Sequence, residues 1–142
     1  MGREQVSARC SAVEEAYEFM LAYAGQGLSG KEHSQACGQV REFLNRAAEA
    51  LTGLGEDYSS AVRDEKLQPA DRYTAFLKVL ERDALDSLAS IHLVLAQPII
   101  SSQLIDNLNA SIHLRALLTD LFLIDEIFKP QPVAERPAIT NS

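Results

Sequence analysis

Apolar residues recur every three or four positions along most of the chain, which is the spacing of one face of an α-helix. The pattern predicts four helices, at residues 3–24, 31–66, 69–97 and 100–128, within a single domain over residues 1–128. The clearest apolar face belongs to the second helix and comprises Val40, Phe43, Leu44, Ala47, Leu51, Leu54, Tyr58 and Val62. Short loops between helices of this length favour antiparallel neighbours. We therefore expect an all-α fold, a four-helix up-down-up-down antiparallel bundle.

Glycine and proline positions set the expected limits of these helices. Gly53 and Gly55 fall inside the second helix, where each costs about 1 kcal/mol relative to alanine and favours a kink or a close helix contact. Because the apolar face continues in phase beyond both glycines, the sequence predicts one bent helix. After Lys129, three prolines in fourteen residues exclude further helix, so residues 129–142 are predicted to form a short flexible tail.

The last predicted helix is apolar on more than one side. A first stripe contains Leu104, Ile105, Leu108 and Ile112, and a second, rotated stripe contains Leu114, Leu117, Leu121, Ile124 and Phe128. One chain needs only one such stripe to cover its own core, so the second stripe is predicted to be an oligomer or partner interface. Two alternatives remain open: this helix is more central than the others, or a bend rotates the stripe.

Composition and charge exclude several classes of function. The chain has 142 residues, of which 46% are hydrophobic, and a net charge of −7, which is typical of a globular domain. Its Lys and Arg residues form no basic stripe, so nucleic-acid binding is not expected. Arg115, Asp120 and Asp125 interrupt the most apolar segment, so no membrane span is expected. Two cysteines without a secretory leader favour free thiols and a cytoplasmic location.

His33 and Cys37 are the strongest candidates for chemistry. They are four residues apart, so they share a face near the positive end of the second helix, where a thiolate is favoured as a nucleophile or metal ligand. No third group that would orient the histidine or complete a zinc site is evident, although a homodimer could combine two such pairs. No Glu lies three residues before any histidine, which argues against a di-iron bundle. No cofactor is predicted.

These observations favour a non-enzymatic protein–protein interaction module: an adaptor, regulator or assembly factor that self-associates through the last helix, with a dimer favoured, and contacts another protein. The alternative is a bundle that binds a small apolar or tetrapyrrole-like ligand between its helices. Its pocket walls would be Tyr17, Met20, Phe43, Tyr58, Tyr73 and Phe76. A lesser alternative is a thiol- or metal-dependent enzyme that uses His33 and Cys37.

Overall fold

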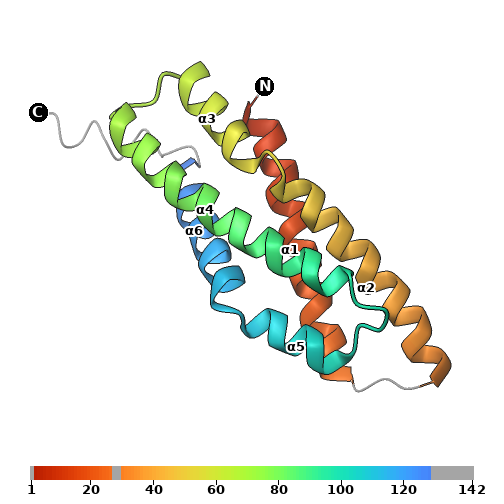
Figure 1. Cartoon of the computed structure of the whole chain (residues 1–142). Helices are drawn as coiled ribbons and strands as arrows, with labels where there is room; N and C mark the ends of the chain where they lie inside the picture. Colours follow the sequence, from red (N-terminus) through yellow and green to blue (C-terminus); the bar gives the residue numbers. More distant parts are fainter. Residues whose placement is uncertain (1, 27–29, 129–142) are drawn as a thin grey trace, which may run out of the picture.

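Six helices and no strands make up the described part of the chain, residues 2–26 and 30–128 of a computed structural model (Figure 1). They are α1 (Gly2–Gln26), α2 (Gly30–Leu51), α3 (Leu54–Asp64), α4 (Ala70–Leu95), α5 (Ser102–Ala110) and α6 (Ile112–Phe128). The all-helical fold class is therefore confirmed. The predicted tail at residues 129–142 lies outside the described residues.

The predicted helix at residues 31–66 is not continuous, because it divides at Thr52 and Gly53 into α2 and α3. Gly53 has a φ of 91°, in the left-handed region that glycine adopts without a steric penalty. A Cβ at this position would also lie 3.3 Å from Nη2 of Arg9, so that guanidinium group would have to shift by a few tenths of an ångström. Helix α3 buries Leu54 and Tyr58 in the same core as α2, which explains why the apolar face stays in phase across the break.

The predicted helix at residues 100–128 divides at Ser111. The ψ angle of Ser111 is 131°, an extended value, so the helical backbone of α5 cannot continue into α6. The Ser111 hydroxyl accepts a hydrogen bond from the His113 amide at 3.3 Å, and its carbonyl accepts one from the Arg115 amide at 3.1 Å. Ser111 thus begins α6 as a capping residue. The rotated apolar stripe marks this break, since α5 and α6 turn different faces toward one core.

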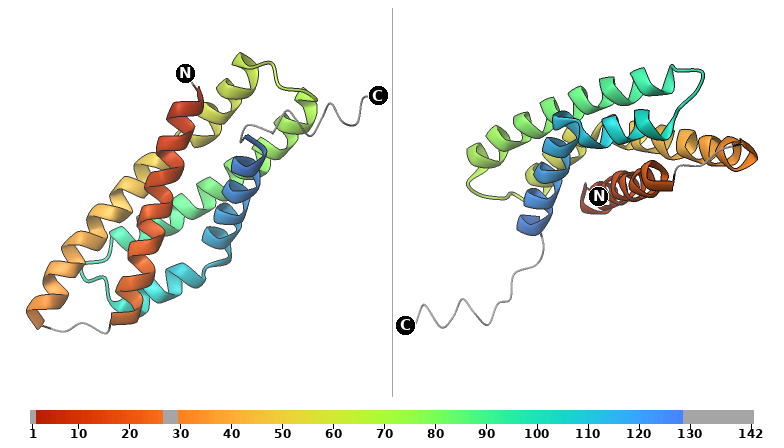
Figure 2. Two further views of the ribbon diagram at one scale, coloured as in Figure 1. Left: turned by 180° about the vertical axis from the view of Figure 1, so that it is seen from behind. Right: turned by 90° about the horizontal axis from the view of Figure 1, so that it is seen from below.

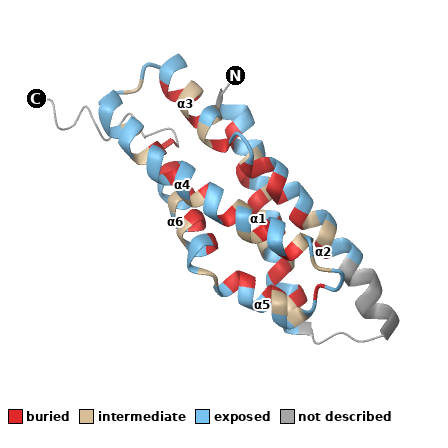
Figure 3. Cartoon of the chain, in the orientation of Figure 1, coloured by how far each residue is buried: buried red, intermediate tan, exposed pale blue. Residues whose placement is uncertain are grey.

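Helices α1 and α4 lie on opposite sides of the molecule, as the front and back views show (Figures 1 and 2). Helix α1 packs against α2, α3 and α5, whereas α4 packs against α2, α3 and α6. Buried residues concentrate on the sides of the helices that face one another (Figure 3). The largest buried side chains include Tyr23 and Tyr58, and the Tyr23 hydroxyl donates to the Ile100 carbonyl at 2.6 Å.

Three arginine side chains in the described part of the chain bind carbonyls at the C-terminal ends of other helices. Arg9 of α1 donates to the carbonyls of Glu49, Ala50 and Thr52 at 3.1, 2.9 and 2.7 Å. Arg41 of α2 donates to the carbonyls of Leu95, Gln97 and Pro98, and Arg3 of α1 donates to that of Phe128. Neither α2 nor α6 has a basic residue in its own last turn, so these arginines supply charge that favours the ends of the helix dipoles.

Candidate functional site

The outer face of α6 is the candidate site, and we define it by Ile112, Ala116, Thr119, Leu123 and Ile127. Ile112 is 74% exposed and Leu123 is 51% exposed, although the opposite side of the same helix lies in the core. A shallow groove of about 460 Å³ follows this face. Its lining residues are Ala110, Ile112, Arg115, Ala116, Thr119 and Asp120.

The residues that the sequence assigned to the interface lie on the other side of this helix. Leu114, Leu117, Leu121, Ile124 and Phe128 are each at most 6% exposed and belong to the core of the chain. Within the single chain these residues fill the space against neighbouring helices and are not exposed to a partner. The sequence did contain a signal for the outer face: Ile112, Ala116, Thr119 and Leu123 follow steps of four, three and four.

Asp120 is the acidic residue of the site whose pKa is shifted. Burial, a hydrogen bond with Asp83 of α4 and repulsion by that carboxylate raise the pKa of Asp120 to about 7. Its Oδ2 atom is buried and has no hydrogen-bond partner in the described part of the chain. Farther along α4 and α6, His113 Nδ1 lies 3.9 Å from Asp86 Oδ2, and Ser87 Oγ donates to the His113 carbonyl at 3.0 Å. The edge of the outer face next to α4 is therefore acidic.

A small apolar groove lies where the N-terminal part of α4 meets the C-terminal part of α6. It has a volume of about 230 Å³ and is lined by Arg72, Tyr73, Phe76, Leu123, Ile124 and Ile127. This volume is below the roughly 300–1,000 Å³ of small-molecule pockets. Tyr73 and Phe76 are two of the six residues predicted to surround a ligand.

The other four predicted ligand residues lie elsewhere. Met20 and Tyr58 are buried in the core, while Tyr17 and Phe43 are half-buried and pack against it. Phe43 also stacks on Phe19 with ring centroids 4.5 Å apart. These positions are explained by packing.

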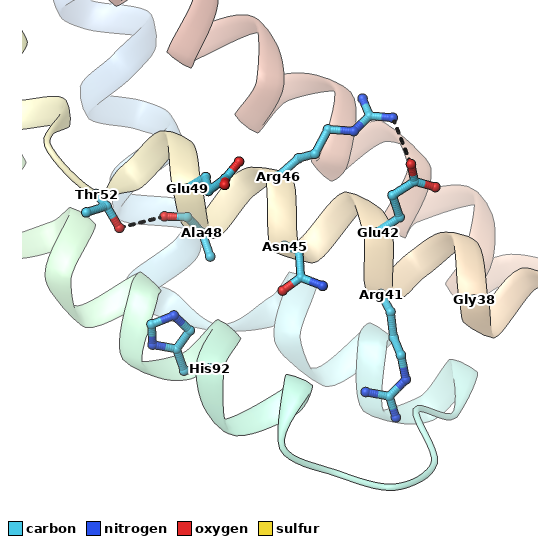
Figure 4. A pocket seen from close by; sticks show the side chains of 9 residues that line it. All are labelled: Gly38, Arg41, Glu42, Asn45, Arg46, Ala48, Glu49, Thr52 and His92. Carbon is cyan, nitrogen blue, oxygen red and sulfur yellow. Dashed lines mark hydrogen bonds and ion pairs between the residues drawn. The ribbon is translucent and has the colours of Figure 1, made fainter.

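A polar cleft of about 680 Å³ runs along α2 on its side next to α4 (Figure 4). It is lined by Gly38, Arg41, Glu42, Asn45, Arg46, Ala48, Glu49, Thr52 and His92. Asn45 and His92 point into it from opposite sides, whereas Arg41 points to the loop after α4. Arg46 points away from the cleft, lies over the Phe43 ring at 4.7 Å and approaches Glu15 and Glu42 at 3.8 and 3.9 Å. Both cationic side chains thus have structural partners, and the hydroxyl of Thr52 donates to the Ala48 carbonyl at 2.9 Å.

Cys10 has a structural position. It is buried, and its sulfur lies 3.2 Å from the Tyr58 hydroxyl. Burial raises the pKa of the Cys10 thiol to about 11, so the thiol stays protonated and unreactive at neutral pH. The side chains of His33 and Cys37 lie outside the described residues, so the proposed thiol or metal pair stays a prediction. Among the described side chains, no three potential metal ligands come together.

Two further findings bear on the class of protein. Within residues 2–26 and 30–128, no helix is both long enough and apolar enough to cross a membrane. The chain matches no protein-family model, no curated protein and no solved structure.

Proposed function

We propose that this chain is a non-enzymatic interaction module, an adaptor, regulator or assembly factor, that self-associates through the outer face of α6. The observation that carries the proposal is the exposure of Ile112 and Leu123 on a helix whose opposite side already fills the core. Monomeric proteins rarely expose contiguous apolar patches larger than a few hundred Å² without a binding role. A second copy would cover these side chains.

The arrangement of the helices supports this role. We interpret the six helices as an up-down-up-down bundle of four rods, in which α2 with α3 and α5 with α6 each take the place of one helix. The arginine contacts at the helix ends stiffen such a bundle and hold α6 in place. We also propose a cytoplasmic location. The buried, unpaired thiol of Cys10 and the net charge of −7 are compatible with it.

Sedimentation velocity over a concentration series tests the proposal. Leu123→Glu places a charge on the outer face and should leave the protein folded but monomeric at every concentration. Leu85→Glu is the matched control, because Leu85 is 58% exposed and lies on the side of α4 away from Asp83 and Phe76. It should associate like the wild type. A wild-type protein that stays monomeric at about 100 μM, a concentration well above the dissociation constants of stable dimers, would contradict the proposal.

Native mass spectrometry of gently purified protein tests the alternatives at the same time. A dimer mass, or a complex with another protein, supports the interaction module. An added mass from a small apolar or tetrapyrrole-like ligand supports the ligand-binding alternative. Bound zinc that disappears in Cys37→Ser supports the metal or thiol enzyme.

A further inference from the structure

The outer face of α6 has the residue spacing of a coiled-coil seam. Ile112 and Thr119 occupy one set of equivalent positions, and Ala116 and Leu123 occupy the other, which gives the alternating steps of four and three typical of a and d positions. Ala116 and Thr119 are small, so a second helix can approach closely at the middle of the seam. The groove along this face is lined by Ile112, Ala116 and Thr119 but does not reach Leu123.

Two opposite charges flank the seam. Arg115 occupies the g position before Ala116, and Asp120 occupies the e position after Thr119. Arg115 is exposed and has no carboxylate within 4.0 Å in the described part of the chain, and Asp120 has no cation within that distance there. Arg115 is therefore free to pair with a partner, and Asp120, whose Oδ2 atom is buried beside Asp83, has no cation to balance it in this part of the chain.

The placement of these charges selects an orientation. In a parallel pair of helices, a g residue lies beside the e residue five positions later on the other helix, which brings Arg115 of one copy to Asp120 of the other. In an antiparallel pair related by a two-fold axis, g positions face g positions and e positions face e positions. When the seam from Ile112 to Leu123 overlaps fully, that arrangement places Arg115 beside Phe122 of the other copy and Asp120 beside His113. It therefore gives Arg115 no carboxylate partner, unlike the parallel pair.

We propose that a second copy of this chain docks parallel to the first along α6, with two reciprocal ion pairs between Arg115 and Asp120. This inference rests on the proposed self-association and adds the orientation and the paired charges. Asp83, next to Asp120, gives the incoming guanidinium a second carboxylate, so the acidic edge of the face is complementary to Arg115.

The seam is short. From Ile112 to Leu123 it covers eleven residue steps, about 16 Å at 1.5 Å per residue. Such a contact falls at the small end of specific interfaces, so the dimer is expected to be weak, with a dissociation constant on the order of micromolar, and sensitive to salt.

Disulfide trapping tests the orientation in the full chain with Cys37→Ser as background. Thr119→Cys alone and Ala116→Cys alone should each give a covalent dimer under mild oxidation, because a parallel seam places each position next to its own counterpart. Ala89→Cys, on an exposed part of α4, is the control and should give little dimer. If only a mixture of the Ala116→Cys and Thr119→Cys proteins forms the disulfide, the helices are antiparallel and the inference is overturned.

A charge exchange tests the ion pairs. Arg115→Asp or Asp120→Arg alone should weaken association about five- to ten-fold, and the chain that carries both should recover it. Circular dichroism verifies that each variant is folded, and the trapping experiment stands independently of these substitutions. A wild-type dimer that is insensitive to the exchange would overturn this inference but leave self-association intact. A wild-type monomer that yields no trapped dimer would overturn both proposals.

Discussion

Asp120 gives the most direct test of the electrostatics described above. Its pKa is raised from an ordinary value of 3.8 to about 7, so the folded chain binds a proton that the unfolded chain releases between those pH values. Stability therefore decreases as pH rises from about 4 to about 7, and the penalty is complete above pH 7. The full shift corresponds to about 4 kcal/mol at 1.36 kcal/mol per pKa unit. Because Asp120 is only partly buried, screening by water reduces the expected penalty to about 1–2 kcal/mol.

Asp120→Asn removes this titration and keeps the shape of the side chain. In urea unfolding at about 0.1 μM protein, roughly tenfold below the expected dissociation constant of the dimer, the variant should gain about 1–2 kcal/mol over the wild type at pH 8. The gain should shrink steadily toward pH 4. Asp83→Asn should produce part of the same gain, because it removes the neighbouring carboxylate, and the double variant should gain less than the sum.

The control is Asp106→Asn, which removes an exposed carboxylate from α5. It should change the free energy of unfolding at pH 8 by no more than about 0.5 kcal/mol, as is usual for an exposed surface substitution. A difference between Asp120→Asn and the wild type that is equal at pH 4 and pH 8 would refute the argument, and so would a gain that grows toward acid pH.

Three further outcomes follow from particular contacts. Arg9→Met should lower the free energy of unfolding by about 2–3 kcal/mol in urea titration, because three carbonyls and Asp57 lose their hydrogen-bond donor. Arg9→Lys should retain part of the lost stability. An Arg9→Met protein as stable as the wild type would contradict the capping role of Arg9. Asn109→Leu should raise thermal stability by about 1 kcal/mol, since Asn109 is buried with neither amide atom hydrogen-bonded in the described part of the chain, and a lower melting temperature would show that the amide has a partner. In a Cys37→Ser background, Cys10 should resist a thiol reagent at pH 8 and react fully in urea, whereas prompt labelling of the native protein would contradict its burial.

The periodicity of the sequence was sufficient to predict the helical class, because α1 and α4 have long, uninterrupted apolar faces between clear end signals. Its limits appear at Gly53 and Ser111. At Gly53 the apolar phase continues across the turn, so periodicity alone cannot reveal the break, and only the left-handed φ distinguishes it. At Ser111 the phase does change, but a change of phase is also what an interface on a continuous helix would produce.

The candidate site was harder to predict for the same reason. Leu114, Leu117 and Leu121 were assigned to an interface because both stripes were placed on one straight helix. Once α6 is a separate helix, its strongest apolar stripe belongs to the core and its weaker one, with Ala116 and Thr119, faces outward. Contacts such as those of Arg3 and Arg9 join residues more than forty positions apart, and no local pattern encodes them.

The arginine contacts at the helix ends also determine how the molecule opens. Arg3 and Arg9 of α1 bind the last carbonyls of α6 and α2, and Arg41 of α2 binds the carbonyl of Leu95 at the end of α4 and those of Gln97 and Pro98 after it. A helix end that is held by another helix cannot fray without breaking a contact between helices, so local opening is coupled to separation of the bundle. We therefore expect amides in the last turns of α2, α4 and α6 to exchange with solvent as slowly as those in the core. The exchange rates of amides at these helix ends would then measure how cooperatively the whole chain unfolds.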